Sequence, residues 1–294
     1  MSGEYAVVFG EPGIAIPAPI GIRATFVEDT KSDHLDIKWQ GIVGNDAWIE
    51  YLRKIIALAE QGRSPFRGTL TIVNELPLQK GMGSSTALVI AVARCLLGQG
   101  KEAEAHAIED AVNPGNSGID FAVIWNDAPL LFRRGHPPTP ITLPKNFLAE
   151  ALLIDTGKPT ETTAELVAWV KEREEDPRVK QALKDIGRCA ERIRKGEDLR
   201  PVFRDHHRAQ AALGIVPKTV AKMIAEIEHL GGGAKVIGAG GKTLLRSSGA
   251  PAGQAGGGGM VLAIHKNPNL LLPVVRRQKF HALPLALLRT SAGL

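Results

Sequence analysis

The fold of this chain is decided by the stretch Pro77-Leu-Gln-Lys-Gly81-Met82-Gly83-Ser84-Ser85-Thr86-Ala87. It follows an apolar segment, Gly68–Asn74, that is typical of a strand, and it leads into a helical pattern over Ser84–Leu97. Glycines allow a tight turn whose backbone N–H groups face one phosphate, and a helix N-terminus adds a partial positive charge. The serine hydroxyls can bind a phosphate oxygen or Mg²⁺. The structural alternative is a serine N-cap after a glycine turn, but the strand–loop–helix context favours phosphate binding.

A second concentration of glycine lies in the C-terminal half, where twelve of the 32 glycines fall between Gly231 and Gly259. The segment Gly238-Ala-Gly-Gly-Lys242-Thr243 ends like a Walker A loop, but Val236 stands where that motif requires glycine. The cluster lies between two short strand-like segments, Ala234–Ile237 and Met260–Ile264. It therefore predicts either a backbone that approaches a substrate or nucleotide closely, or a mobile loop.

Two acidic residues form the third candidate constellation. Glu109 lies at the end of a predicted helix, Glu102–Ala111, and Asp120 follows eleven residues later, after a tight loop. Two acids of this kind can divide the work, since one binds Mg²⁺ while the other takes a proton or orients a hydroxyl. The alternative is a solvated helix end followed by an Asx turn.

The order of predicted elements indicates an α+β fold with two domains. Extended segments are expected at Tyr5–Phe9, Ile20–Glu28 and His34–Gln40, then a helix at Asp46–Gln61 and a hairpin that pairs Phe121–Trp125 with Pro129–Phe132 around Asn126–Asp127. The second half begins with a strand, Ala151–Asp155, and continues with four helical stretches at 161–175, 178–195, 199–213 and 217–230. Because two strands follow those helices, the pattern favours α+β over a doubly wound parallel sheet. The proline-rich passage 136–146 predicts a boundary between domains 1–145 and 146–294.

Composition limits the classes of partner. The 294 residues are 44% hydrophobic and 23% charged, with a net charge of +5 and two cysteines, which predicts a globular cytoplasmic protein without a disulfide framework. No apolar run reaches the roughly 18–20 residues that span a bilayer, and no secretory signal pattern is present. No nucleic-acid-binding motif is found, whereas the positive charge fits an anionic small molecule. The apolar segment Phe280–Leu288 favours a packed strand or a contact in a homodimer over a membrane anchor.

Taken together and in this order, the motifs resemble those of the GHMP kinase superfamily, and most closely the mevalonate kinases. The family's P-x-x-x-G-[LM]-G-S-S-[AST] is matched at 77–86, and its acidic segment E-x-x-x-H-G-x-P-S-G-[IV]-D has the same span at 109–120. Similar segments are G-E-H-A-V-V-x-G at 3–10, T-x-x-P-x-x-T at 155–162, L-G-V at 212–215 and G-A-K-L-T-G-A-G-G at 233–241. The resemblance implies an N-terminal ribosomal-S5-like α/β domain and a C-terminal ferredoxin-like α+β domain.

The resemblance also implies a function, which is ATP-dependent phosphorylation of the 5-hydroxyl of mevalonate with Mg²⁺ as cofactor. The implied ATP-phosphate ligands are Lys80, Gly81, Met82, Gly83, Ser84, Ser85 and Thr86. Ser85 and Glu109 would bind the metal, and Asp120 would be the catalytic acid/base. The acceptor would be bound by Glu4, Tyr5, Thr162, Gly238, Ala239 and Gly240.

Three departures from the family pattern keep other acceptors open. The family carries a lysine, in A-P-G-K, just before G-E-H, and only Met1 and Ser2 precede Gly3 here. Tyr5 replaces the family histidine, as in the G-E-Y of phosphomevalonate kinases, and residues 242–255 interrupt the glycine motif. The alternatives are therefore phosphomevalonate kinase or another small-molecule kinase of the superfamily, a catalytically weak nucleotide-binding relative, or a decarboxylase.

Overall fold

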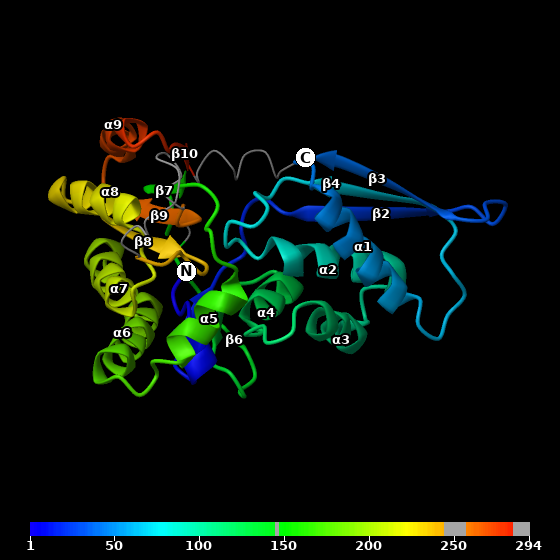
Figure 1. Cartoon of the computed structure of the whole chain (residues 1–294), viewed down its shortest axis with the longest axis horizontal. Helices are drawn as coiled ribbons and strands as arrows, with labels where there is room; N and C mark the ends of the chain where they lie inside the picture. The colour runs from blue at the N-terminus through cyan, green and yellow to red at the C-terminus, as the bar shows by residue number, and fades with distance from the viewer. Residues whose placement is uncertain (145–146, 244–256, 285–294) are drawn as a thin grey trace, which may run out of the picture. The chain divides into compact units, whose positions relative to one another are not determined.

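The computed structural model describes residues 1–144, 147–243 and 257–284, and these form two units that alternate along the sequence (Figure 1). Unit 1 contains Met1–Pro19, Gln79–Met82 and the described part of 128–294, whereas unit 2 contains Ile20–Leu78 and Gly83–Asp127. The units differ from the predicted domains 1–145 and 146–294. The N-terminal segment Met1–Pro19 and the residues Gln79–Met82 of the motif 77–87, called the glycine-serine loop below, pack with the C-terminal half. The chain thus changes unit within that loop.

Unit 2 is a three-stranded sheet with helices packed against it. The strand order is β2 (Ile22–Glu28), β4 (Gly68–Asn74), β3 (Leu35–Gly41), with β4 antiparallel to β2 and parallel to β3. The helices are α1 (Asp46–Ala59), α2 (Ser84–Leu97), α3 (Glu102–Val112) and α4 (Ile119–Asn126). Leu35, Ile37 and Trp39 of β3 pack against the buried core beneath these helices, as expected for alternate residues of the extended segment predicted at His34–Gln40. α2 is almost entirely apolar and is buried along most of its length, because the other helices and the sheet surround it.

The predicted hairpin between Phe121–Trp125 and Pro129–Phe132 is wrong. The first segment lies within helix α4, while the second forms β5 (Leu130–Phe132), which pairs with β1 (Gly13–Ala15) and β6 (Thr139–Pro140) in unit 1. Periodicity cannot separate a short apolar strand from a buried helix, and the buried side chains of α4 give such a run. The segment Tyr5–Phe9 was also predicted to be extended, but Ala6–Phe9 forms a 3₁₀-helix, η1.

Unit 1 contains a four-stranded antiparallel sheet, which confirms the α+β class. The strand order is β10 (His281–Pro284), β7 (Ala151–Asp155), β9 (Met260–Ile264), β8 (Gly233–Ile237). Met260 pairs with Asp155 on one side and with Ile237 on the other. The end of β7, the end of β8 and the start of β9 therefore meet at one edge of the sheet, and the glycine-rich loops leave from this edge.

Helices cover both faces of that sheet (Figure 1). The helices of unit 1 are α5 (Thr163–Lys171), α6 (Pro177–Arg194), α7 (Leu199–Leu213), α8 (Lys218–His229) and α9 (Leu272–Arg277), with a 3₁₀-helix, η2 (Pro268–Leu271), before α9. Alternate residues of β7 face opposite sides, since Leu153 packs with α6 and α7 while Leu152 packs with α8 and α9. In the described part of the chain, no helix is both long and apolar enough to span a membrane.

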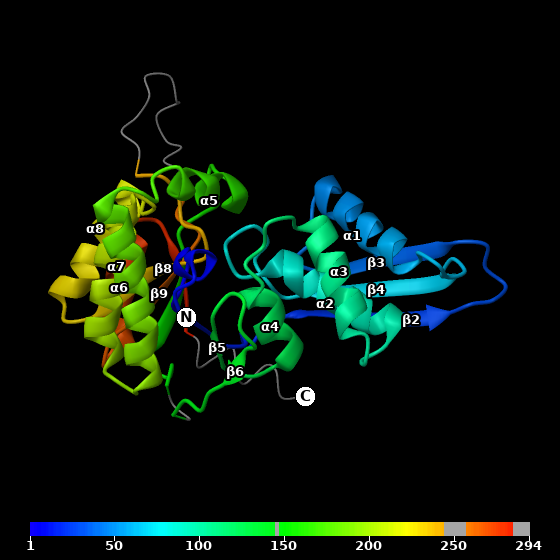
Figure 2. The same cartoon turned by 90° about the horizontal axis from the view of Figure 1, so that it is seen from below.

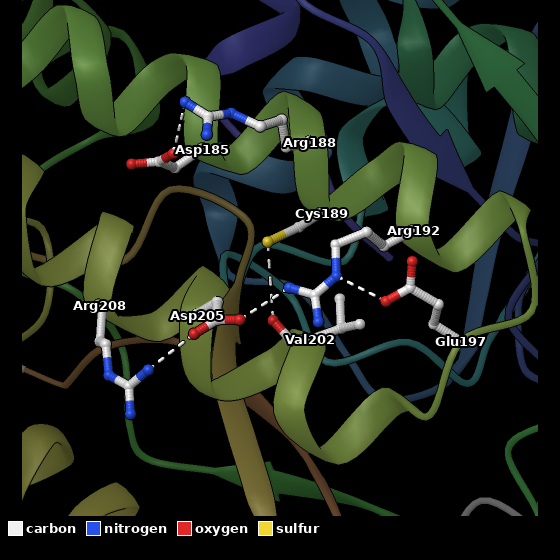
Figure 3. A network of polar contacts seen from close by, with 8 residues as sticks. All are labelled: Asp185, Arg188, Cys189, Arg192, Glu197, Val202, Asp205 and Arg208. Atoms are coloured by element: carbon white, nitrogen blue, oxygen red, sulfur yellow. Dashed lines mark hydrogen bonds and ion pairs between the residues drawn. The ribbon is translucent and has the colours of Figure 1, made fainter.

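The α6–α7 pair lies side by side in both views and is joined by polar contacts (Figures 1, 2 and 3). Arg192 of α6 donates to Glu197 at 2.8 Å and to Asp205 of α7 at 2.7 Å, and the Cys189 thiol donates to the Val202 carbonyl at 3.7 Å. These contacts hold α7 against α6. The position of α7 matters for the site because this helix carries the buried residue His206.

Candidate active site

The glycine-serine loop gives α2 an N-terminus without a side-chain cap. Gly83 is the N-cap residue, with φ +65°, and no side chain caps the helix, so the alternative of a serine N-cap is wrong. A left-handed φ favours glycine, which explains the residue type at this position. Ser84 and Thr86 are buried, whereas Ser85 is partly exposed. Because the first N–H groups of a helix lack intrahelical acceptors, this end of α2 is suited to binding an anion.

Asp120 lies against this same helix end. Gly118, with φ +81°, is the N-cap of α4 and places Asp120 in the first turn of that helix. A Cβ atom added to Gly83 would lie 3.2 Å from Asp120 Cγ and 3.3 Å from Oδ2. The structure therefore brings together the loop and the acid that the sequence singled out separately, although they are 37 residues apart.

Glu109 is almost fully buried beside the first turn of α2. Thr86 Oγ1 donates to Glu109 Oε1 at 2.8 Å, so the residue that contacts Glu109 is the one after the predicted Ser85. Glu109 Oε2 is buried and, among the described residues, has no hydrogen-bond partner. Burial raises the pKa of Glu109, the hydrogen bond from Thr86 opposes this, and the nearby charge of Asp120 raises it further. No cation among the described residues pairs with this carboxylate, and a divalent cation would supply the counter-charge.

A Mg²⁺ ion at this position would have few protein ligands. In residues 1–144, 147–243 and 257–284, no three His, Cys, Asp or Glu side chains gather into a metal site. Mg²⁺ commonly binds through one or two side chains and completes its shell with water and substrate phosphates. The unpartnered Glu109 oxygen and the partly exposed residue Ser85 therefore fit this ion when it arrives with a nucleotide.

In unit 1, the glycine loops touch one another through their backbones. A Cβ atom on Gly238, which follows β8, would lie 2.4 Å from Gly81 Cα, and one on Gly257 would lie 2.2 Å from the Gly157 carbonyl oxygen. Lys80 is also anchored by its backbone, since its carbonyl accepts a hydrogen bond from the Met260 N–H at 3.1 Å. These approaches leave no room for side chains, which explains the density of glycine at this edge of the sheet. Gly256 and residues 244–255 lie outside the described residues.

Gly238→Ala is expected to lower the free energy of unfolding for two reasons, the positive φ at this position and the clash of the added Cβ with Gly81. Gly196→Ala is the matched control, because Gly196 has φ +77° against +74° for Gly238, but open space where a Cβ would be. The control should lower the free energy of unfolding by ~1–2 kcal/mol, and Gly238→Ala by a further ~1–3 kcal/mol from the clash with Gly81. Denaturant unfolding of both variants measures the difference. Equal losses would contradict the inferred contact.

Glu4 lies in a buried ionic cluster and not in an open pocket. Lys235 Nζ donates to Glu4 Oε1 at 2.5 Å, and His206 Nε2 lies 3.1 Å from Glu4 Oε2; the Lys235 and His206 side chains are fully buried. Burial raises the pKa of Glu4, but the Lys235 ammonium and the contact with His206 outweigh this, so the pKa lies well below its usual range. Burial and the Lys235 charge lower the pKa of His206 to about 4. Burial lowers the pKa of Lys235, and the Glu4 carboxylate opposes this, so the cluster pairs Glu4 with the Lys235 ammonium beside a neutral imidazole.

The next residue, Tyr5, is held in a conformation that is unusual for a side chain of its size. Its φ is +63°, it is 5% exposed, and its hydroxyl donates to the Ala239 carbonyl. Burial raises the pKa of Tyr5, as do the charges of Glu161 and Glu4, so the hydroxyl stays protonated as a donor. A non-glycine residue with positive φ costs on the order of 1–3 kcal/mol unless its surroundings hold it. The buried Glu4 cluster and the Ala239 carbonyl hold it on two sides.

The other predicted acceptor-binding residues lie in unit 1 with Tyr5. Gly240 follows Ala239 in the glycine turn, where a Cβ would lie 2.3 Å from the Ile215 carbonyl oxygen. Thr162 is the exposed N-cap of α5, and its hydroxyl and backbone N–H form a capping box with Glu165. This hydroxyl therefore already has a structural function.

Sequence reasoning missed the partners of Glu4. From the sequence, His206 is interpreted as a structural residue and not a metal ligand, and Lys235 is not singled out. The available signal was a lysine at the centre of β8, a strand otherwise buried and apolar except for glycine, because a charge in such a strand needs a partner. Nothing in the sequence indicated that this partner would come from the N-terminal segment.

Comparison with known proteins identifies a matching family model and similar structures. The family model "GHMP kinases N terminal domain" matches residues 50–124, a span that contains the whole glycine-serine loop, Glu109 and Asp120. Over 96% of this chain and 93% of its own, the crystal structure of the Methanococcus jannaschii mevalonate kinase superposes with a TM-score of 0.73 at 17% identity. The chain has the GHMP kinase fold.

Other similar proteins carry related names. The mevalonate kinase of Pyrococcus horikoshii is 29% identical over 81% of this chain and 82% of its own length, and that of Archaeoglobus fulgidus is 29% identical over 81% and 85%. A structure of L. major mevalonate kinase in complex with R-mevalonate shares the GHMP kinase fold with a TM-score of 0.70 at 18% identity, covering 94% of this chain and 88% of that one. The resemblance predicted from the motifs is confirmed.

Proposed function

We propose that this protein transfers the terminal phosphoryl group of ATP to the 5-hydroxyl of mevalonate. The observation that carries the proposal is the position of the Asp120 carboxylate against the N-terminus of α2, within 3.3 Å of a Cβ placed on Gly83. A kinase needs an acid or base beside its phosphate-binding loop, since the acceptor hydroxyl must attack there. The similarity to mevalonate kinases over 81% of the chain supports the choice of acceptor.

The glycine-serine loop would bind the phosphates of ATP. Gly81, Met82 and Gly83 supply backbone N–H groups, Ser84 and Thr86 belong to the first turn of α2, and Lys80 adds a positive charge. Ser85 is the partly exposed residue of this turn, and its hydroxyl is proposed to face the nucleotide. Phosphoryl transfer depends mainly on such positioning and on neutralising charge, so the backbone geometry is itself a large part of catalysis.

Glu109 and Ser85 would hold Mg²⁺, with Thr86 fixing the Glu109 carboxylate through its hydrogen bond of 2.8 Å. The bound ion neutralises the negative charge of the phosphates. Asp120 would accept the proton of the acceptor hydroxyl, or orient that hydroxyl for attack.

We propose that the acceptor is bound by the backbone of Gly238, Ala239 and Gly240 together with Tyr5 and Thr162. The hydrogen bond from the Tyr5 hydroxyl to the Ala239 carbonyl supports a common role in acceptor binding for Tyr5 and the glycine turn 238–240. Glu4 is proposed to act through Tyr5, because its own carboxylate is occupied by Lys235 and His206.

A coupled assay of ADP release tests this function with mevalonate, phosphomevalonate and homoserine as separate acceptors. We expect ATP- and Mg²⁺-dependent turnover with mevalonate, at a kcat/KM at least about tenfold above that with either other acceptor. Preference for phosphomevalonate would support the alternative that Tyr5 raised. ATP binding without turnover of any acceptor would contradict the proposal and favour a nucleotide-binding relative.

A further inference from the structure

An ion pair in unit 1 joins the glycine-serine loop to the end of β7. Lys80 Nζ forms an ion pair and hydrogen bond with Asp155 Oδ2, and the two side chains are 26% and 23% exposed. Lys80 directly precedes Gly81, so its ammonium is the positive charge closest in sequence to the phosphate-binding segment. The proposed reaction gives Asp155 no task, although its carboxylate occupies the lysine that a phosphate would be expected to attract.

The backbones of both partners are fixed. The Lys80 carbonyl accepts from the Met260 N–H at 3.1 Å, and the neighbouring Gly81 packs against Gly238. Asp155 pairs with Met260 in the sheet, and its Oδ1 accepts from the Gly157 N–H at 2.9 Å. The mobile part of the pair is therefore the four-carbon stem of Lys80, whose ammonium can change partner while the backbone stays in place.

A nucleotide phosphate is a stronger partner for this ammonium than the Asp155 carboxylate, which is mostly buried. A triphosphate carries several negative charges, and lysine binds phosphate as a compact point charge. An ion pair with partial exposure contributes little free energy by itself, so it can be exchanged. A bound phosphate that gains Lys80 must nevertheless offset the loss of the contact with Asp155.

We propose that Asp155 competes with the nucleotide for Lys80. In the nucleotide-free protein the carboxylate holds the ammonium, and on binding the ammonium moves to the phosphates. Asp155 is thus a positioning residue that weakens the binding of ATP and ADP, which favours release of the product. This inference rests on the proposed kinase function for the presence of a nucleotide at the loop, but not on the identity of the acceptor.

Nucleotide affinity, measured by calorimetry with ATP and with ADP and without any acceptor, tests the competition. We expect Asp155→Asn to tighten binding by about three- to tenfold, and Lys80→Met to weaken it by about tenfold. In the Lys80→Met background, Asp155→Asn should tighten binding by less than about twofold, because no ammonium remains to be released. Lys158→Met is the matched control, since it removes an exposed lysine from the loop that follows Asp155 and should leave the affinity within about twofold of wild type.

The double variant separates competition from simple repulsion. If Asp155 acts only by repelling phosphates, Asp155→Asn tightens binding equally in both backgrounds, and the proposal is overturned. An unchanged affinity in Lys80→Met, with an unchanged melting temperature, also overturns it. Lys80→Arg keeps the charge and should bind ATP within about threefold of wild type. Failure of wild type to bind ATP would instead contradict the kinase function, whereas binding without turnover of mevalonate would leave the Lys80 result interpretable.

Discussion

Asp120→Asn is expected to reduce kcat by about 10²–10⁴-fold while the dissociation constant of ATP changes by less than about threefold. Asparagine has nearly the shape of aspartate, so the contact with Gly83 at the start of α2 is preserved. It cannot accept a proton from the acceptor hydroxyl, which is the task proposed for the carboxylate. Removing a negative charge beside the phosphate-binding helix end would, if anything, tighten nucleotide binding.

Asp110→Asn is the control for this change. Asp110 belongs to α3, is more than half exposed, pairs with His106, and accepts from the Asn116 amide at 2.9 Å. Asparagine keeps an oxygen that can accept this hydrogen bond, so the substitution should leave kcat within about twofold of wild type. Single-turnover measurements with saturating ATP and mevalonate isolate the chemical step from product release. Wild-type turnover in Asp120→Asn would show that another residue serves as the base.

Most element positions could be predicted from the sequence because their signals are local. β4, α2, β7 and β9 have the predicted bounds, since each has a clear apolar pattern and all but β7 begin at or directly after a glycine. The arrangement of strands around four helices also predicted the α+β class. By contrast, α4 was misassigned because its short apolar run lacks the length that distinguishes a helix from a strand.

The site was predicted in part for the same reason. The loop from Gly81 to Ser85 and the pair Glu109 and Asp120 were found because each is a short motif with its own chemistry. The contact of Gly83 with Asp120, and that of Gly81 with Gly238, join segments that are far apart in the chain. Such contacts depend on packing, and no local pattern encodes them. The change from unit 1 to unit 2 between Met82 and Gly83 likewise depends on packing and not on a local pattern.

Lys235→Met is expected to cause the largest loss of stability, lowering the free energy of unfolding by about 3–5 kcal/mol at pH 7. Lys235 is fully buried and is 2.5 Å from Glu4 Oε1, so its removal leaves a buried carboxylate without a counter-charge. Burial is the largest cause of the lowered pKa of His206 and remains in the variant, so it opposes protonation of this histidine as a replacement counter-charge. Lys184→Met, at an exposed position of α6, should change stability by less than about 0.5 kcal/mol.

The pH dependence identifies the carboxylate as the cause. In wild type the pKa of Glu4 lies below its usual range, so the ion pair stabilises the fold above the unfolded-state pKa, and this contribution is lost as the pH falls through the folded-state value. Without Lys235, burial would raise the pKa of Glu4 above its unfolded value, and the variant would lose stability as the pH rises. The difference between wild type and Lys235→Met should therefore be smaller at pH 4 than at pH 7. A difference independent of pH would mean that lost packing, and not the unpaired charge, destabilises the variant.

Glu4→Gln combined with Lys235→Met provides the decisive comparison. A neutral amide beside a methionine leaves no buried charge, so most of the stability lost in Lys235→Met should return, since replacing both members of a buried ion pair is often close to neutral. Activity should not return with it. Glu4 precedes Tyr5, whose φ of +63° is maintained by buried contacts on both sides, and the Tyr5 hydroxyl donates to Ala239 in the glycine turn. A stable double variant with a raised KM for mevalonate would therefore indicate that the ion pair positions Tyr5, whereas a stable double variant with wild-type kinetics would limit the pair to stabilising the fold.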